Sequence, residues 1–161
     1  MSMIIDGTNG LTFNNATTQA SAGVVLQVVQ GTYATTVSSS TNTAIATGLT
    51  ATITPKFATS KILVLINHPL NKKSADNSAN DISFWLYKNG SNLLQISPDL
   101  AFTNTAIQLY LSFSYAYLDS PATTSATTYA TYFSSFNSNA ASVSVGLSNV
   151  TNTIILMEIA A

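Results

Sequence analysis

Few side chains of this sequence could take part in acid–base chemistry, and they are scattered along the chain. There is one histidine, His68, one glutamate, Glu158, and no cysteine. A catalytic site needs a nucleophile with a positioned base, a pair of carboxylates or a set of metal ligands. Because His68 has no such partner nearby in the sequence, we interpret it as a histidine in a loop or at a strand end that makes a local hydrogen bond. Glu158 lies in the last apolar segment and, if buried, would need Lys61 or another donor.

Two aspartates that flank a polar loop are the best candidates in the sequence for the ligands of a metal ion. Asp76 and Asp81 could hold a cation together with Asn77 and Asn80. Their spacing does not follow the pattern of a calcium-binding loop, in which the ligands alternate along the loop and end in a glutamate. The sequence therefore favours a solvated loop at this place. It predicts no metal ligand, no catalytic residue and no cofactor.

Asp119, Ser120 and Pro121 form a turn motif between two apolar segments. A short carboxylate before Ser-Pro can accept backbone amide hydrogens two residues further on, and these bonds stabilise the turn. We therefore predict a local structural role for Asp119 rather than a chemical one.

The composition excludes several functional classes. Only 7% of the 161 residues are charged, against about 25% in typical proteins, and the five lysines are accompanied by no arginine. Binding to nucleic acid requires a cluster of basic residues, so we expect no nucleic-acid partner. No apolar run approaches the length of about 18 residues that a membrane-spanning helix needs, and the N-terminal residues lack the features of a signal peptide. We therefore expect no membrane insertion.

Polar and apolar residues alternate in a series of short segments, as is typical of β-strands with one buried face. Leu49, Ala51 and Ile53 alternate with threonines, and Pro55 ends that segment. The run from Ile62 to Ile66 is instead apolar throughout, which suits a strand that is covered on both faces. This contrast indicates a two-layer β protein in which some strands are covered by more than their own core.

The other expected strands complete an all-β fold. Asn89-Gly90 predicts a tight hairpin, and the large residues at the odd positions of 106–118 predict its core face. We expect connections at 67–80 and at Pro98–Asp99. With eight or more strands and no helical periodicity, the sequence predicts an antiparallel jelly-roll sandwich over residues 23–161. The further expected strands are 24–29, 82–87, 93–96, 106–118, 127–136, 142–147 and 153–159.

Residues 1–22 form a unit of their own in the sequence. Ile4 and Ile5 precede an Asp-Gly pair, and Leu11 and Phe13 follow an Asn-Gly pair, which is typical of a small hairpin or an extended arm. A piece of this size is not stable alone, so we expect it to dock on another protein and to act as an anchor. The alternative is a frayed terminus.

The segment 127–136 carries aromatic rings on both faces. If Tyr129 and Phe133 fill the core of a single chain, Tyr132 and Phe136 lie on its surface. An exposed aromatic row normally meets a partner, so we predict Tyr132 and Phe136 as a trimer interface. Trp85 and the other tyrosines could stack on a sugar, although rings at alternating strand positions are more often core or interface residues.

Several stretches, taken in order, resemble one family of proteins. They are VLQVV at 25–29, GLTATITPKFATSKILVLI at 48–66, YKNG at 87–90, LDSPATTSATTY at 118–129 and ILMEIA at 155–160. Together they resemble the C-terminal domain of many bacteriophage tail-fibre and related virion proteins. The opening IIDGTNGLTF resembles a segment that often precedes this domain in phages of aquatic bacteria. The resemblance implies a jelly roll similar to the tumour-necrosis-factor and C1q type, assembled as a homotrimer on the surface of a virion.

The sequence thus predicts a non-enzymatic virion protein, assembled in the host cytoplasm and anchored to other tail or capsid proteins through residues 1–22. As a short tail or head fibre, it would attach to the host, with a host-surface glycan as the candidate ligand. A capsid-decorating trimer that stabilises the shell is the alternative, which the short length favours. A polysaccharide depolymerase is a remote alternative, because it would need paired carboxylates in a groove and the acidic residues here are scattered.

Overall fold

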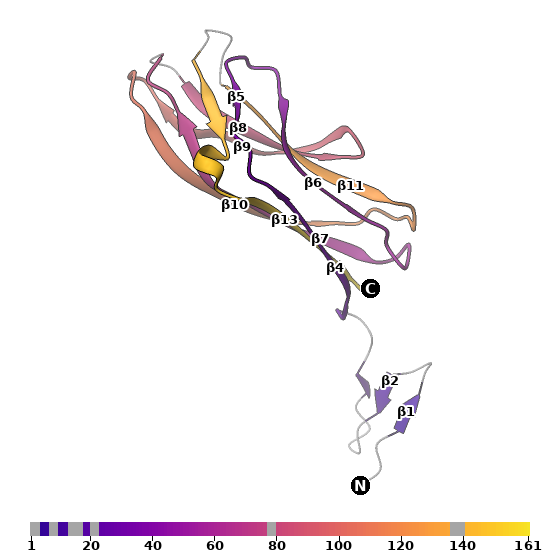
Figure 1. Ribbon diagram of the computed structural model, residues 1–161. Helices are drawn as coiled ribbons and strands as arrows, with labels where there is room; N and C mark the ends of the chain where they lie inside the picture. Colours follow the sequence, from indigo (N-terminus) through magenta and orange to yellow (C-terminus); the bar gives the residue numbers. More distant parts are fainter. Residues whose placement is uncertain (1–3, 7–9, 13–17, 20–22, 77–79, 136–140) are drawn as a thin grey trace.

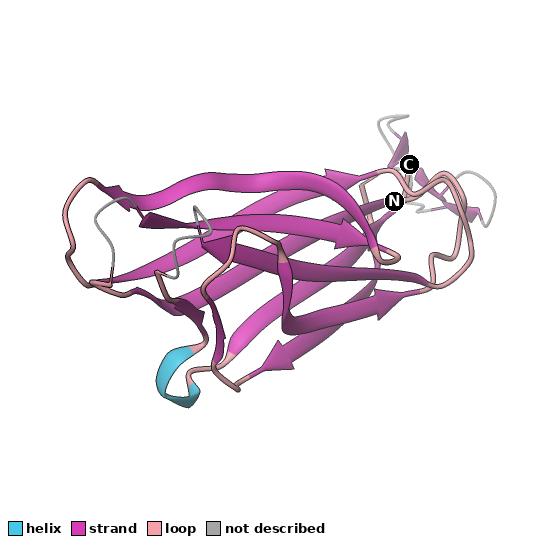
Figure 2. Ribbon diagram, turned by 90° about the horizontal axis from the view of Figure 1, so that it is seen from above, coloured by secondary structure: helices cyan, strands magenta, loops and turns pink. Residues whose placement is uncertain are grey.

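The computed structural model describes residues 4–6, 10–12, 18–19, 23–76, 80–135 and 141–161 (Figure 1). From residue 23 onward the chain forms two antiparallel β-sheets that face each other as a sandwich (Figure 2). The only helical segment among the described residues is a short 3-10 turn, η1 (Leu147–Asn149). In the same part of the chain, no helix is long and apolar enough to cross a membrane.

Each layer of the sandwich is built around four long strands. The first sheet has the order β4 (Val25–Tyr33), β13 (Asn152–Ile159), β7 (Lys61–Lys73) and β10 (Leu109–Asp119). Two short strands extend it, since β12 (Val143–Val145) pairs with the end of β7, and β5 (Val37–Ser39) pairs with β12. The second sheet has the order β6 (Ile45–Ile53), β11 (Thr127–Ser135), β8 (Asn80–Lys88) and β9 (Ser91–Thr103).

The pairing of the eight long strands is nested. In chain order, the first strand pairs with the last (β4 with β13) and the second with the seventh (β6 with β11). The third pairs with the sixth (β7 with β10) and the fourth with the fifth (β8 with β9). A long hairpin folded over in this way gives two facing antiparallel sheets, which is the jelly-roll arrangement. The predicted fold class is therefore confirmed.

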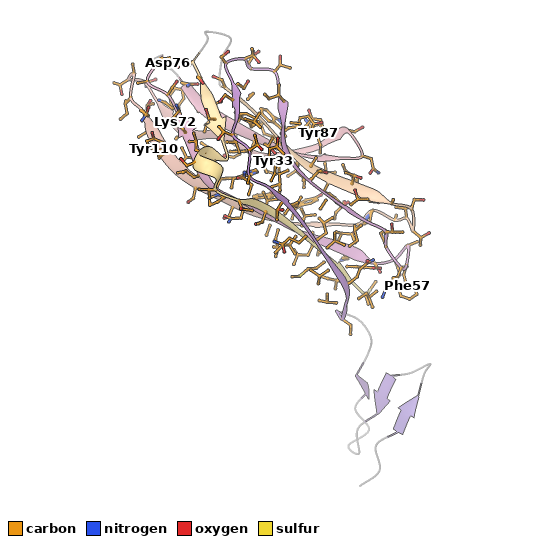
Figure 3. The ribbon with its side chains drawn as sticks, viewed as in Figure 1. Tyr33, Phe57, Lys72, Asp76, Tyr87 and Tyr110 are labelled. Atoms are coloured by element: carbon orange, nitrogen blue, oxygen red, sulfur yellow. The ribbon has the colours of Figure 1, made fainter. Side chains whose placement is uncertain are left out.

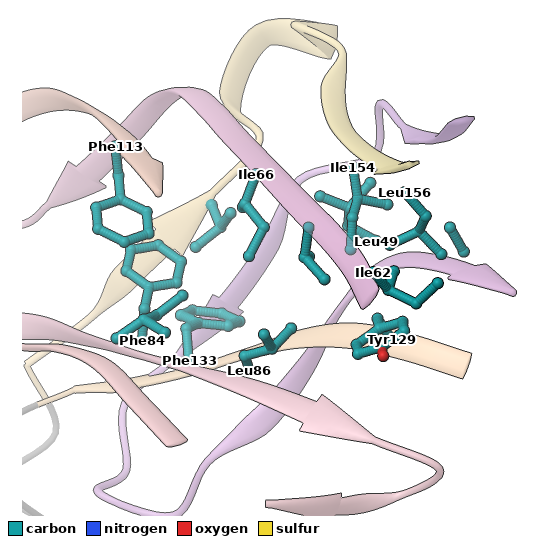
Figure 4. Close-up of a cluster of buried hydrophobic side chains, with 14 of the residues drawn as sticks. Leu49, Ile62, Ile66, Phe84, Leu86, Phe113, Tyr129, Phe133, Ile154 and Leu156 are labelled. Carbon is teal, nitrogen blue, oxygen red and sulfur yellow. The ribbon is translucent and has the colours of Figure 1, made fainter. Parts of the chain in front are cut away.

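The space between the two sheets is filled by aliphatic and aromatic side chains (Figure 4). Across the sandwich, the ring of Phe84 stacks on that of Phe113, with 4.7 Å between the ring centres. Burying a side chain of this size contributes about 1.5–3 kcal/mol, so this core supplies most of the favourable free energy of folding. Its fully buried members include Leu49, Ile62, Val64, Leu86, Tyr129, Phe133, Ile154 and Leu156.

Two detailed predictions about the strands are confirmed. On β10, the odd-numbered Phe113 and Tyr115 pack on the core, whereas Tyr110 is exposed. The prediction fails at Ile107, which lies before the start of β10 and is exposed. The β8–β9 hairpin turns at Asn89 and Gly90, whose φ angles are 50° and 79°. Positive φ at both central residues gives the two-residue turn that matches the twist of the strands.

The connection predicted at 67–80 is partly wrong, because β7 continues to Lys73. Within this extension, the register against β10 shifts between His68 and Asn71, so that Pro69 lies at a bulge. A bulge leaves one residue out of the ladder of hydrogen bonds, and a proline is tolerated there.

The prediction that Pro98 and Asp99 end their strand is also wrong. β9 continues through both residues to Thr103, and its register against β8 shifts on either side of Leu100. The same reason applies, since the two bulges accommodate residues that a regular ladder would exclude.

The described residues before position 23 lie in a small sheet of their own. Strands β1 (Ile4–Asp6), β2 (Gly10–Thr12) and β3 (Thr18–Gln19) pair antiparallel in this order. Ile4 and Ile5 lie in β1 and Leu11 lies in β2, whereas Phe13 is outside the described residues. The anchoring role of this segment stays a prediction.

Candidate functional site

The outward side of the first sheet carries aliphatic side chains. Because successive strand residues point to opposite faces, β7 buries Ile62, Val64 and Ile66 and turns Leu63 and Leu65 outward, where both are half-buried. β13 follows the same pattern, with its core residues alternating with half-buried Ile155 and Met157. The apolar run at 62–66 is therefore covered on one face only within a single chain.

The strand register aligns these residues into two rows that cross all four strands. The exposed fractions of Val28 and Leu118, at the two ends of the first row, are 56% and 47%. A third row is polar, since it consists of Ser114, Asn67, Thr153 and Thr32. We call the first two rows the outer apolar face; the first is Leu118, Leu63, Met157 and Val28, and the second is Ala116, Leu65, Ile155 and Gln30.

A contiguous apolar surface of this kind is unusual on a soluble monomer. Such a patch with a polar border marks a place where another macromolecule binds. The two rows contain no charged side chain, and Gln30 is their one strongly polar member. The chemistry of the face therefore suits association through apolar contact rather than recognition of a polar ligand.

The outward side of the second sheet is different and carries aromatic rings and threonines. The rings of Tyr87 and Tyr132 stack with 3.8 Å between their centres, and Trp85 lies opposite Tyr132 in the register. Nearby, the hydroxyl groups of Thr52 and Thr128 are 2.7 Å apart. Tyr132, one of the predicted interface residues, thus lies on the sheet opposite the outer apolar face and is half-buried by its own chain. The other, Phe136, is outside the described residues. We call Trp85, Tyr87 and Tyr132 the aromatic cluster.

His68 lies inside the sandwich and links the two sheets. Its Nδ1 is 2.9 Å from Oδ1 of Asn152, and its Nε2 is 3.1 Å from the hydroxyl of Thr131. Because the amide nitrogen of Asn152 donates to the carbonyl of Tyr33, Nδ1 of His68 is the donor to Asn152 and Nε2 accepts from Thr131. The hydroxyl of Thr131 is in turn 2.6 Å from that of Thr47.

This arrangement makes His68 a structural residue. Burial lowers its pKa to about 4, against the hydrogen bond with Asn152, which raises it. The imidazole is therefore neutral at pH 7, and no part of it is exposed to solvent. The interpretation of His68 as a loop or strand-end residue with a local hydrogen bond is wrong, because β7 continues past it and its partners lie on β11 and β13.

Asp119, the first residue of the predicted turn motif, also connects the two sheets. Its carboxylate forms an ion pair with Lys88 at 2.9 Å and accepts a hydrogen bond from the hydroxyl of Tyr129 at 2.6 Å. Burial, together with this carboxylate, raises the pKa of Tyr129. Ser120 is exposed and Pro121 is half-buried. The contacts of Asp119 hold the end of β10 against β8 and β11.

Glu158 is fully buried and fixes the loop that follows β6. It accepts hydrogen bonds from the backbone amides of Lys56 (2.7 Å) and Phe57 (3.3 Å) and from the side chain of Gln27 (2.5 Å). Burial opposes ionisation of Glu158, but these bonds outweigh it and lower its pKa. The donors that a buried Glu158 needs are thus two backbone amides and the side-chain amide of Gln27 rather than Lys61.

Replacing Glu158 with glutamine is expected to lower the free energy of unfolding by about 2 kcal/mol. The two backbone amides donate to one carboxylate oxygen of Glu158, and the side-chain nitrogen of Gln27 donates to the other. The amide nitrogen of a glutamine would therefore face donors in either orientation. Urea denaturation of the full chain measures the loss. The matched control is Gln95→Glu on strand β9 of the second sheet, where the side chain is exposed and a change within about 0.5 kcal/mol is expected.

The aspartates considered as cation ligands have different partners. Asp76 is exposed near Lys72, at the end of the sandwich opposite Phe57 (Figure 3), and accepts hydrogen bonds from Ser74 and from the backbone of Ser142. Asp81 is fully buried and faces the carboxyl group of Asp99. Burial and this neighbouring carboxyl group raise the pKa of Asp81 to about 7.

Of the two asparagines of the predicted loop, only Asn80 belongs to the described residues, and it does not join these aspartates. The side chain of Asn80 accepts a hydrogen bond from the hydroxyl of Ser135 at 2.8 Å. Asn77 lies outside the described residues. The three described residues of this group, Asp76, Asn80 and Asp81, therefore form no common site.

No protein-family model matches this chain, and no curated protein matches its sequence. Among solved structures, it is similar to a chain of the infectious bursal disease virus particle, with 13% identity, a TM-score of 0.43 and coverage of 84% of this chain and 36% of that one. It is also similar to a chain of the Gx strain of that virus, with 14% identity, a TM-score of 0.45 and coverage of 100% and 42%. This chain spans less than half the length of those chains, and at these values the likeness defines no family.

Only part of the outer apolar face could be predicted from the sequence. The unbroken run at 62–66 signals apolar side chains on both faces of a strand, and this signal is correct for Leu63 and Leu65. Ile155 and Met157 carry the same signal in the segment 153–159. Their alignment with Val28 and Leu118 depends on strand order, which the alternation within one segment does not specify.

Proposed function

We propose that this chain is a non-enzymatic structural protein of a bacteriophage virion and assembles as a homotrimer through its outer apolar face. The observation that supports assembly is the pair of apolar rows, which leaves Val28 and Leu118 about half exposed in a single chain. Apolar surface in water costs free energy, and association with copies of the same chain removes that cost. Placement on a virion and the threefold symmetry, of the tumour-necrosis-factor and C1q type, rest on the sequence resemblance.

The chemistry of the face favours identical chains as its occupants. Interfaces of permanent homo-oligomers resemble a divided protein core, whereas transient interfaces are more polar. The outer apolar face has this core-like composition, and the polar row with Ser114 and Asn67, joined by a hydrogen bond of 2.9 Å, forms a border on one side. A central apolar region with a polar border is the usual plan of a stable interface.

The mass of the purified chain in solution tests the proposal. Native mass spectrometry at micromolar concentration is expected to give three times the chain mass of 16.9 kDa. A monomer at this concentration would contradict assembly. The measurement needs no phage and no partner, so it separates the trimer from its placement on the particle.

Two placements on the virion follow from the proposal, and stoichiometry separates them. In a short tail or head fibre, the small sheet at residues 4–19 is the anchor and the jelly roll is the free end. In a capsid-decorating trimer, the same segment lies along the shell. Quantitative mass spectrometry of purified particles is expected to find a handful of trimers for a fibre and hundreds of chains for a decoration protein.

Attachment to a host glycan is a second candidate function, and the aromatic cluster favours it. Aromatic rings can stack on sugar rings, and hydroxyl groups beside them can donate hydrogen bonds to the oxygens of the sugar. If the outer apolar face is buried in the trimer, the aromatic cluster lies on the opposite sheet and stays accessible. Purified trimers are then expected to block phage adsorption, and trimeric Trp85→Ala protein is expected not to. Trimers that leave adsorption unchanged would count against this function.

A further inference from the structure

Uncharged polar side chains border the aromatic cluster on the outer surface of the second sheet. In the strand register, Trp85 lies opposite Gln95 of β9, and Tyr87 lies opposite Asn92 of the same strand. On the other side, two strands away from Tyr87, β6 carries Thr50 in the same row. Gln95, Asn92 and Thr50 are all exposed to solvent. The rings therefore have amide groups on one side and a hydroxyl group on the other.

These polar groups match the hydrogen-bonding groups of a sugar. The side-chain amide of asparagine or glutamine carries two donor hydrogens and an acceptor oxygen, and a sugar hydroxyl group both donates and accepts. The apolar face of a sugar ring can lie on an aromatic ring, while the hydroxyl groups at its edge reach the side chains around that ring. The second sheet offers both kinds of contact on one surface.

The positions of the lysines leave no free positive charge at this surface. The chain has five lysines, all within the described ranges, and no arginine. Only Lys88 lies on the second sheet, and its ammonium group is bound to the carboxylate of Asp119 at 2.9 Å. Three other lysines lie on β7 of the first sheet, and Lys56 donates to a backbone carbonyl of β4 in that sheet.

The acidic residues make an anionic ligand still less favourable. Within their described bounds, β6 and β11 carry no charged residue, whereas β8 and β9 carry Asp81 and Asp99. Proteins bind the carboxylate of a sialic or uronic acid through arginine or lysine. On this sheet such a carboxylate would lose water without gaining a cation, and the remaining acidic groups would repel it.

We propose that the aromatic cluster, together with Asn92 and Gln95, binds an uncharged oligosaccharide and does not bind glycans that contain sialic or uronic acid. The ligand class is a chain of neutral hexoses or N-acetylhexosamines, which stack on the rings and form hydrogen bonds with the two amides. This inference rests on the glycan attachment proposed above and specifies its ligand.

An array of oligosaccharides tests the class of ligand. The array holds uncharged oligosaccharides of glucose, galactose and N-acetylhexosamines beside anionic ones that contain sialic or uronic acid. The labelled full chain is expected to bind members of the uncharged group only. Because Trp85 is the one tryptophan of the chain, titration with a bound oligosaccharide is expected to change the tryptophan fluorescence until the site is saturated.

Asn92→Ala tests the place of the site. The variant loses one hydrogen bond to the sugar and is expected to bind the same oligosaccharide about tenfold more weakly. Because Asn92 is exposed, the variant is expected to fold. The matched control is Asn104→Ala, which removes another exposed asparagine, beyond the end of β9, and is expected to bind as the wild type does. Equal binding by Asn92→Ala and the wild type would overturn the proposal.

The other outcomes separate this inference from the function on which it rests. Binding to anionic glycans that Trp85→Ala abolishes would overturn the inference about charge and leave glycan attachment standing. A chain that binds no member of the array would contradict both. Tryptophan fluorescence that changes when the glycan-free protein is diluted would show that copies of the chain meet at the aromatic cluster, which would also contradict both.

Discussion

A chain that carries glutamate in place of both Leu63 and Met157 is expected to be monomeric. The two residues are direct neighbours in the register of β7 and β13, in the middle of the first apolar row. In a trimer built through this face, each glutamate would be buried without a partner, which costs several kcal/mol (~3 or more) for each charge. Native mass spectrometry is expected to give a mass of 16.9 kDa where the wild-type chain gives three times that value.

The same variant is expected to keep its fold, because both side chains point away from the core. The matched control is the double substitution Thr52→Glu and Thr128→Glu. These residues are also direct neighbours on adjacent strands, and their side chains point outward from the second sheet. The control places the same two charges side by side on the opposite surface of the molecule and is expected to remain trimeric.

Tyr132→Glu distinguishes the two surfaces that could form the trimer. If the outer apolar face is the interface, this variant stays trimeric, because Tyr132 lies on the opposite sheet and stacks on Tyr87. Monomers from Tyr132→Glu, together with trimers from the Leu63 and Met157 double variant, would place the interface on the aromatic cluster. That outcome would favour the interface inferred from the sequence alone.

The alternation of side chains predicted the fold because it reports a local property of each strand. Leu49 and Ile53, Tyr129 and Phe133, and the odd positions of β10 all face the core as their spacing predicts. The Asn-Gly hairpin was equally clear, since positive φ at both residues is a local requirement as well.

The ends of the strands were predicted less well, because proline and polar residues do not always end a strand. Pro69 and Pro98 both lie within strands, at positions where the register shifts. Asn71 and Lys73 are polar but fully buried on β7, where hydrogen bonds satisfy the nitrogen of each side chain. Composition alone indicates a loop in such a stretch, whereas pairing with β10 and β12 makes it a strand.

Contacts between distant segments were not accessible from spacing. Asp99 acts on the buried carboxyl group of Asp81 from the paired strand β9, and the register of β9 against β8 shifts on both sides of Leu100, which the spacing of residues in the sequence does not specify. His68 meets Asn152 and Thr131 only once the last strand lies beside β7 and the second sheet covers it. The sequence therefore indicated which polar residues have a structural role but did not identify their hydrogen-bond partners.

The contribution of His68 to the stability of the protein is expected to fall as the pH is lowered from about 6.5 to about 4, because His68 must stay neutral in the folded state. An unfolded chain binds a proton at His68 with a pKa of 6.5, whereas in the folded chain burial lowers this pKa to about 4. Between these values the unfolded state holds the extra proton, so acid favours unfolding. The full difference amounts to about 3 kcal/mol and is complete below pH 4.

Comparison with His68→Asn isolates this contribution. Asp81 acts in the opposite direction, because its raised pKa of about 7 makes the folded chain hold a proton that the unfolded chain has lost, so that its contribution falls as the pH rises. Glu158, whose pKa is lowered, adds acid sensitivity at a lower pH. Both effects are common to the two proteins and cancel in the difference of their free energies of unfolding, measured in urea at one chain concentration.

The free energy of unfolding of the wild type minus that of His68→Asn is expected to shrink by about 3 kcal/mol between pH 7 and pH 4, because only the wild type has a histidine that binds a proton on unfolding. A difference that stays constant over this range would show that His68 is already protonated in the folded chain or is not buried there.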